Sequence, residues 1–296
     1  MASDDITVPP LLVIVGETAS GKSTLAMELA KRLGGEIICA DSWTVRREVN
    51  IGTAKPSPEE RAAVPHHLLD IVGPDEDFTA ALFKRLANDM VNDISRRGKL
   101  PILVGGTGLY VDGILFDYGF LPHGDRSKRA ELNELDIDQL IAIVRERGLS
   151  TEGIDIRNKR RLMRLMETDG AVPTRGALRA HTLIIGLSPD RQTLNDAIDA
   201  RVDSMIASGL EDEVAALAGR YGWECEALKG VGYAQWKDYF EGRQSLSDTR
   251  QRIIKATRDL AKRQRTWFKR NKSIRWFPTP VNEDQLVEII TTTLFN

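Results

Sequence analysis

The chain has 296 residues, of which 42% are hydrophobic and 28% charged, and its formal net charge is −2. This length holds one large domain, or a domain with a sizeable insertion, and the longest apolar runs are far too short to cross a bilayer. The slightly acidic balance excludes a global basic field for nucleic acid, so any RNA contact must come from local patches.

Cysteine usage and the N-terminus indicate the compartment. Cys39 and Cys225 are the only cysteines, and two cysteines so far apart form neither a zinc knuckle nor a disulfide framework. The acidic N-terminus lacks the apolar core of a signal peptide. We therefore expect a cytoplasmic protein with no membrane segment. No exposed heptad or long edge strand indicates self-association, so we expect a monomer.

The first third of the chain alternates short apolar strands with helical stretches. The pattern predicts strands at residues 11–15, 36–40 and 101–104, and helices at residues 24–33 and 78–98. Such alternation is typical of a parallel sheet with helices on both faces.

The pattern changes after Phe116. Residues 126–176 contain no convincing strand, and their apolar spacing predicts short amphipathic helices. A strand at 182–187, helices at 190–219 and 247–272, a short strand at 274–277 and a closing helix at 283–294 follow. We therefore predict an α/β core at residues 1–117 and 181–296, interrupted by a helical insertion at residues 118–180.

A glycine-bearing loop follows the first predicted strand and precedes the first predicted helix. It matches the phosphate-loop pattern G-x-x-x-x-G-K-[ST] in full, with Gly16, Glu17, Thr18, Ala19, Ser20, Gly21, Lys22 and Ser23. The glycines let backbone N–H groups turn toward phosphate oxygens, and the helix N-terminus adds a positive dipole. Lys22 adds a point charge, and Ser23 offers a hydroxyl to Mg²⁺. The motif predicts a P-loop NTPase-like fold that binds a polyphosphate or diphosphate.

Asp41 follows the second predicted strand, at the edge of the sheet where α/β proteins bind ligands. A carboxylate there can hold Mg²⁺ through water, as in ordinary P-loop NTPases. It can instead be the general base for a substrate nucleophile, or only cap the following turn. The sequence leaves these three roles open.

A glycine-rich turn at residues 105–108 ends the third predicted strand. Such a run lets a ligand approach the backbone closely. Thr107 is its only polar side chain, and it either points into a ligand site or caps the helix that follows. Both interpretations remain open.

Two basic clusters stand out in this slightly acidic chain. Residues 250–272 hold ten cations and a single acid, Asp259. Spacings of three and four place part of this cluster on one helical face, namely Lys255, Arg258, Lys262, Arg265 and Lys269. The second cluster lies in the predicted insertion and consists of Arg157, Lys159, Arg160, Arg161 and Arg164. Charge runs are usually solvated faces, but the scarcity of acids favours a surface for the phosphate backbone of RNA.

Together these motifs resemble the bacterial tRNA dimethylallyltransferase family, also called tRNA isopentenyltransferases. Besides the phosphate loop and Asp41, the resemblance includes Ile-Gly-Thr-Ala-Lys-Pro at 51–56, Pro-His-His-Leu-Leu-Asp at 65–70 and the turn at 105–108. It continues with Asn-Lys-Arg-Arg-Leu at 158–162, Gly-Val-Gly-Tyr at 230–233 and Ala-Lys-Arg-Gln-Arg-Thr-Trp at 261–267. It covers most of the chain, and the family carries a helical insertion at the same place.

The resemblance implies a reaction and several residue roles. The reaction is transfer of a dimethylallyl group from dimethylallyl diphosphate to N6 of adenosine 37, beside the anticodon of tRNA. The phosphate loop, Lys22 and Arg201 would bind the diphosphate with Mg²⁺, Asp41 would be the general base, and Thr107 would position the adenine. Contacts to the tRNA anticodon stem-loop are implied for Asp41, Ser42, Trp43, Thr44, Thr107, Arg129, Arg160, Arg161, Leu162, Met163 and Arg164.

The chain departs from the family's pattern at five positions. These are Glu17 for a usual proline, Arg46 for a tyrosine, Glu48 for a glycine, Asn50 for an aspartate and Ala197 for an arginine. The departures concern tRNA contact and part of the diphosphate clamp, and we expect the core chemistry to survive them.

Three other functions would use some of the same features. A small-molecule kinase would bind ATP with the same loop but leaves the basic helix unexplained. An adenylate isopentenyltransferase would prenylate free AMP, ADP or ATP, against which the helical insertion and the two basic clusters argue. A non-catalytic RNA-binding module would have no use for an intact phosphate loop beside Asp41. Transfer to tRNA is therefore the favoured function.

Overall fold

The computed structural model describes residues 8–121 and 126–295. The start of the chain, on which the expectation of no signal peptide rests, lies outside these ranges. The chain divides into a core unit of residues 1–115 and 179–296 and an insertion unit of residues 116–178. Within the core unit, the Arg179 N–H donates to the Leu115 carbonyl oxygen at 2.7 Å, so the two ends that border the insertion are adjacent. None of the helices in the described residues combines the length and the hydropathy that a membrane span needs.

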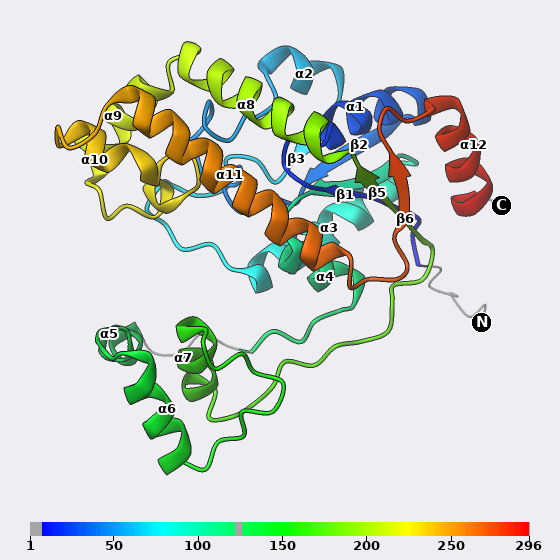
Figure 1. Cartoon of the computed structure of the whole chain (residues 1–296). Helices are drawn as coiled ribbons and strands as arrows, with labels where there is room; N and C mark the ends of the chain where they lie inside the picture. The colour runs from blue at the N-terminus through cyan, green and yellow to red at the C-terminus, as the bar shows by residue number, and fades with distance from the viewer. Residues whose placement is uncertain (1–7, 122–125, 296) are drawn as a thin grey trace. The chain divides into compact units, whose positions relative to one another are not determined.

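A parallel sheet forms the centre of the core unit (Figure 1). Its strands lie in the order β3 (His66–His67), β2 (Gly35–Cys39), β4 (Leu100–Gly105), β1 (Leu11–Gly16), β5 (Thr182–Ser188) and β6 (Arg275–Pro278). The strand β1 pairs with β4 on one side and β5 on the other, so that Leu12 lies opposite both Ile102 and Leu183. Every residue of β1 and β4 is buried, because helices cover both faces of the sheet.

Helices pack on both faces of the sheet. On one face, Leu12 and Ile14 share an apolar cluster with residues of α1 (Lys22–Leu33) and α12 (Glu283–Leu294). On the other face lie α3 (Ala80–Arg96) and α4 (Gly108–Leu115), and α11 (Leu246–Phe268) contacts both α4 and β1. The carboxyl ends of the central strands therefore lie beside the N-termini of α1 and α4 and the last turns of α11.

A second apolar cluster joins α11 to α8 (Arg191–Ala207) and α9 (Leu210–Tyr221). The single helix predicted at residues 190–219 is wrong, since the chain breaks between α8 and α9 at Gly209, whose φ is 95°. Glycine adopts this left-handed conformation without a steric penalty. The core unit also contains the short elements α2 (Pro58–Ala63), η1 (Glu226–Lys229), η2 (Ala234–Trp236) and α10 (Lys237–Phe240).

The insertion unit contains three helices in its described residues: α5 (Arg126–Glu134), α6 (Ile137–Glu146) and α7 (Lys159–Glu167). The side chains of Asp136 and Asn158 cap the N-termini of α6 and α7. Leu140 and Val144 of α6 pack with Leu162 of α7 in a separate apolar core. The short amphipathic helices predicted for this region are therefore present.

The predicted strands are confirmed, and one further strand is present. The two-residue strand β3 pairs with β2, so that His66 lies opposite Ile37 and His67 opposite Ile38. Such a short edge strand has no alternation from which a sequence pattern could predict it.

Candidate active site

The phosphate loop carries several unpaired backbone donors. Its left-handed residues, Ala19 with φ 62° and Gly21 with φ 84°, turn the chain between β1 and α1. Among the described residues, none accepts a hydrogen bond from the N–H groups of Ala19, Gly21, Lys22 or Ser23. Unpaired donors beside the positive end of the α1 dipole suit the binding of an anion.

Two cations line a cavity at this loop. The Lys22 ammonium donates to the Glu17 carbonyl oxygen at 3.2 Å, and the Arg201 guanidinium of α8 donates to the Thr53 carbonyl oxygen at 3.2 Å. Burial, followed by the positive charge of Arg201, lowers the pKa of Lys22 to about 8. Burial also lowers the pKa of Arg201. Two partly desolvated cations beside unpaired amides suit a ligand with several negative charges, such as a diphosphate.

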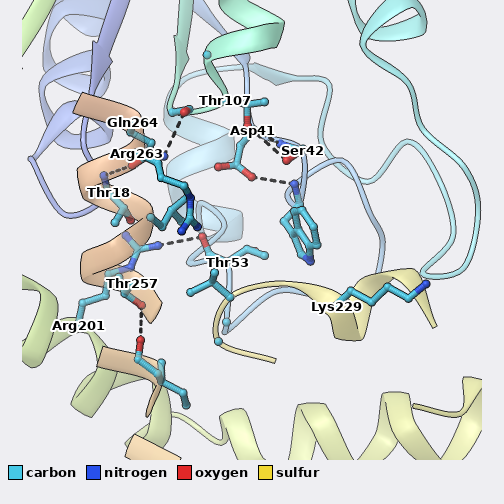
Figure 2. A pocket seen from close by; sticks show the side chains of 18 of the residues that line it. Thr18, Asp41, Ser42, Thr53, Thr107, Arg201, Lys229, Thr257, Arg263 and Gln264 are labelled. Atoms are coloured by element: carbon cyan, nitrogen blue, oxygen red, sulfur yellow. Dashed lines mark hydrogen bonds between the residues drawn. The ribbon is translucent and has the colours of Figure 1, made fainter. Parts of the chain in front are cut away.

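Asp41 follows β2, and its carboxylate forms the turn cap that was one of the three roles left open by the sequence. Its Oδ1 accepts hydrogen bonds from the backbone N–H groups of Trp43 at 2.8 Å and Thr44 at 3.3 Å, which is the geometry of a turn cap. The described residues engage only this oxygen, and the Asp41 side chain also lines the cavities (Figure 2). The cap therefore orients the carboxylate and leaves Oδ2 for a ligand.

Thr107 is held beside Asp41 by the backbone. The Thr107 N–H donates to the Ala40 carbonyl oxygen at 3.2 Å, and the Thr107 hydroxyl accepts from the Ser42 N–H at 3.1 Å. A Cβ atom at Gly105 would lie 2.0 Å from the Ala40 carbonyl oxygen, so only glycine allows this close approach. The hydroxyl binds the turn after β2 instead of capping α4, and Thr107 also lines the larger cavity.

Two cavities open at the carboxyl ends of β2, β4 and β1, which are neighbours in the sheet. The smaller, about 190 Å³, is lined by Lys22 and Ser23. The larger, about 510 Å³, is lined by Thr107, Trp43 and several apolar side chains. The wall between the two cavities consists of Thr18, Asp41, Thr53, Arg201, Leu260 and Gln264, which line both.

Several polar residues that line the cavities received no role from the sequence, among them Thr53, Arg263 and Gln264. Thr53, Arg263 and Gln264 line the larger cavity together with Asp41 and Thr107 (Figure 2). Thr53 belongs to the motif at residues 51–56, and Arg263 and Gln264 belong to the motif at residues 261–267. Those motifs were the available signal, but their letters do not say which side chains point into a cavity.

The loop that carries Thr53 is fixed by one carboxylate. Glu213 accepts hydrogen bonds from the backbone N–H groups of Asn50, Ile51 and Gly52 at distances between 2.8 and 3.1 Å. The Tyr233 hydroxyl also donates to it, at 2.6 Å. This arrangement positions the Thr53 carbonyl oxygen that accepts from Arg201.

Trp43, which the resemblance assigns to the tRNA contact, lines the larger cavity. Its indole N–H donates to the Ala227 carbonyl oxygen at 3.0 Å. A Cβ atom at Gly230 would lie 2.0 Å from the Trp43 indole nitrogen. The glycine of the motif at residues 230–233 therefore leaves room for the indole ring. Ser42 lines the larger cavity and Thr44 the smaller one.

Glu17, the departure within the phosphate loop, faces α11. Its side chain is 5% exposed, and its Oε1 lies 3.7 Å from the Arg265 guanidinium. Burial raises the pKa of Glu17, and the charge of Arg265 opposes that shift. Neither cavity is lined by this residue, and its side chain contacts α11 instead.

The other four departures also lie away from both cavities. Arg46 is buried and donates to carbonyl oxygens of residues 73, 74 and 76. Glu48 has a φ of 66°, a conformation that explains why a glycine suits this position, and it pairs with Arg220 at 2.9 Å. Asn50 lies in the loop bound by Glu213, and Ala197 is half-buried on α8.

Leu162 and Met163, which the resemblance places at the tRNA, have side chains that are only 0% and 3% exposed. They pack in the apolar core of the insertion unit because α7 is amphipathic and turns this face inward. Their side chains are therefore not available to RNA, which corrects that expectation for the side chains. Arg160 and Arg161 on the same helix are exposed.

Arg129 and Arg164 converge on one buried acid in the insertion unit. Each guanidinium lies 3.3 Å from the carboxylate of Glu167, whose side chain is 1% exposed. Arg164 also donates to the Leu121 carbonyl oxygen at 2.6 Å. These two arginines therefore hold the insertion unit together, whatever else they contact.

The basic face of α11 is only partly free. Lys255 and Lys262 are exposed. Arg258 pairs with Asp199 of α8 at 2.7 Å, and Arg265 approaches Glu17 as described above. Two of the five cations predicted on this face thus have acidic partners within the core unit.

The fold and the cavities define the class of the protein. A parallel sheet with a phosphate loop after its central strand, and cavity-lining residues at the ends of two adjacent strands, is the P-loop NTPase-like α/β fold that the sequence predicted. Within that class the chain belongs to the IPP transferase family, whose model matches residues 44–271.

Known relatives are similar along nearly the whole chain. A tRNA dimethylallyltransferase of Geobacillus thermodenitrificans is 41% identical over 282 residues, which cover 90% of each chain. The solved tRNA isopentenylpyrophosphate transferase of Bacillus halodurans is 36% identical, with a TM-score of 0.74 and coverage of 96% of this chain and 95% of that one. A eukaryotic dimethylallyltransferase solved acting on tRNA is 26% identical, with a TM-score of 0.76 over 91% of this chain and 74% of its own.

Proposed function

We propose that this protein transfers a dimethylallyl group from dimethylallyl diphosphate to N6 of adenosine 37 in tRNA and releases diphosphate. The observation that carries the proposal is that the phosphate loop, Asp41 and Thr107 lie at the ends of three adjacent strands, around two cavities with a common wall. An anion site beside a carboxylate is what transfer from an allylic diphosphate to a nucleophile requires.

The reaction needs an activated nucleophile and a stabilised leaving group. An exocyclic adenine amine is a poor nucleophile, because its lone pair is delocalised into the ring. In our proposal Asp41 accepts the N6 proton as the new N–C bond forms and the allylic C–O bond breaks. The electron pair of that C–O bond leaves with the diphosphate, whose charge the loop amides, Lys22 and Arg201 stabilise. Thr107 positions the adenine for attack.

Magnesium is part of the proposal. Mg²⁺ usually keeps several waters and binds one or two protein oxygens together with substrate phosphates. The Ser23 hydroxyl, which lines the smaller cavity at the first turn of α1, fits this requirement. When bound, the ion would neutralise charge on the diphosphate.

The tRNA anticodon stem-loop is the proposed second substrate. The exposed cations Arg160, Arg161, Lys255 and Lys262 support contacts to its phosphate backbone. The adenine must leave its stack to enter the larger cavity, at a cost of about a few kcal/mol, and a single-stranded loop lowers that cost. Cys39 and Cys225 are both free thiols, which supports a reducing cytoplasm, and we propose a monomer.

The test compares two acceptors for one donor. The protein is incubated with dimethylallyl diphosphate and Mg²⁺ together with either unmodified bulk tRNA or free AMP, and nucleosides are then analysed by mass. We expect dimethylallyl adenosine from the tRNA digest and none from AMP. Modified AMP with unmodified tRNA would replace this function by that of an adenylate isopentenyltransferase.

A further inference from the structure

Gln264 of α11 joins the phosphate loop to the glycine-rich turn. Its Oε1 accepts a hydrogen bond from the Thr18 N–H at 2.8 Å, and its Nε2 donates to the Gly106 carbonyl oxygen at 3.1 Å. One side-chain amide thus spans two loops that are far apart in the sequence. The opposite orientation of this amide would set N–H against N–H and oxygen against oxygen, so both partners fix the one described.

The surrounding contacts hold Gln264 in place. Its side chain is 8% exposed, and a Cβ atom at Gly106 would lie 2.2 Å from its Nε2, so the turn must carry glycine for the bond to form. One turn later on α11, the Trp267 indole N–H donates to Asp112 of α4 at 2.9 Å. A Cβ atom at Gly108 would lie 2.2 Å from the Trp267 ring. The end of α11 is therefore fitted closely to the turn and to the helix that follows it.

The same bonds connect the proposed donor site with the proposed acceptor site. Thr18 lies in the loop that offers its other amides to the diphosphate. Gly106 precedes Thr107, whose hydroxyl binds Ser42 next to Asp41. The Gln264 side chain also forms part of the wall between the two cavities. A shift of this side chain would change the separation of the two loops, even though it engages backbone atoms only.

We propose that Gln264 is a positioning residue that sets the distance between the donor loop and the acceptor turn. The inference rests on the proposed function, because donor and acceptor are named there. Misalignment of reacting groups by about 1 Å can cost roughly 10²-fold in rate. Loss of the bridge should therefore reduce the chemical step more than the binding of tRNA.

The test uses two variants and a control on the same helix. Gln264→Met keeps the length and packing of the side chain but removes both hydrogen bonds, whereas Gln264→Glu keeps only an acceptor for the Thr18 N–H. Gln251→Met makes the same change at an exposed position of α11. Single-turnover transfer at saturating donor and tRNA, tRNA affinity, inorganic diphosphate binding by calorimetry and Tm are measured for each variant.

We expect Gln264→Met to slow single-turnover transfer by roughly 10–10²-fold, with tRNA affinity and Tm near those of Gln251→Met. Gln264→Glu should be slow as well, because the bond to Gly106 is lost. Unchanged single-turnover rates in Gln264→Met, or a rate loss that Gln251→Met shares, would overturn the proposal. If the unaltered protein transfers nothing to tRNA, the proposed function fails instead. The role of Gln264 is then tested by the affinity of the protein for inorganic diphosphate. That affinity must fall at least threefold in Gln264→Met and stay unchanged in Gln251→Met.

Discussion

The Arg201 guanidinium and the Lys22 ammonium line the same small cavity from two different helices, and the charge of Arg201 adds to burial in lowering the pKa of Lys22 to about 8. The carboxylate of Asp41 opposes this shift. The free protein therefore holds a phosphate-loop cation whose pKa lies well below the ordinary value of a lysine. A bound diphosphate would favour the charged form and raise the pKa again.

This relationship predicts the pH dependence of donor capture. Lys22 carries its charge below about pH 8 and loses it above, so kcat/KM for dimethylallyl diphosphate should fall as pH rises through that value. kcat should stay level over the same range, because the bound donor keeps Lys22 protonated. Initial rates from about pH 6.5 to 9.5 measure both. Lys22→Arg, which does not titrate there, should show a lower but flat kcat/KM. A flat profile in the unaltered protein would contradict the assignment.

Asp41→Asn separates the possible roles of this carboxylate. The amide nearly keeps the shape and the turn cap through its carbonyl oxygen, but it cannot accept the N6 proton. We expect donor and tRNA binding to persist and the single-turnover rate to fall by roughly 10²–10⁴-fold. The rate is measured with pre-bound tRNA across a Mg²⁺ titration. Recovery at high Mg²⁺ would show that Asp41 mainly serves the ion, and near-normal activity with about 1 kcal/mol less stability would leave only the cap.

The exposed cations of α11 can be changed without disturbing the phosphate loop. Lys255→Glu together with Lys262→Glu should weaken binding of any tRNA and flatten the salt dependence of its affinity, since both side chains lack an acidic partner among the described residues. Binding is measured by filter retention at several salt concentrations. The control is Lys99→Glu, at the opposite end of the sheet before β4. Equal affinities and slopes for the double variant and the control would mean that this face is merely solvated.

Arg265→Glu, by contrast, should affect the donor side. Its guanidinium lies beside the buried carboxylate of Glu17 in the phosphate loop, so charge reversal places two carboxylates together. We expect KM for dimethylallyl diphosphate to rise and Tm to fall, and Glu17→Gln in the same chain should restore part of both. A pure loss of tRNA affinity would place Arg265 at the RNA instead.

A stability prediction concerns the far end of the sheet. Glu36 of β2 is buried and bonded to Arg97 and His67, and the hydrogen bonds from Arg97 hold its pKa at about 2, below the ordinary 4.5. The bonds of the ionised Glu36 therefore stabilise the fold fully above pH 4.5, and this contribution is lost as pH falls toward 2. Glu36→Gln should cost about 1–3 kcal/mol at pH 7 in urea unfolding. Asp93→Asn, which removes the exposed acidic partner of Arg97, should lower the free energy of unfolding by under about 1 kcal/mol. Equal costs would contradict the role of burial.

Local patterns explain how much of this fold the sequence predicted. Buried parallel strands are continuous apolar runs, and the loop after Gly16 has a fixed spacing, so β1, β4 and the loop could be placed from the letters alone. The break at Gly209 lies inside a continuous helical pattern, so the sequence did not predict it. The burial of Leu162 could not be predicted, because a motif does not specify which way its side chains point. The bonds of Gln264 join residues separated by 246 and 158 positions, and no local pattern contains them.

The hydrogen bond between Arg179 and Leu115 bears on whether the insertion unit can be removed or replaced. Because the chain departs from the core unit and rejoins it at adjacent points, removing the intervening 63 residues would not require the core to stretch or reclose. A short turn could replace them, and a different module could be grafted at the same junction. The segment can thus be exchanged as a cassette during evolution or by design, while the phosphate loop and its neighbouring strand ends remain as they are.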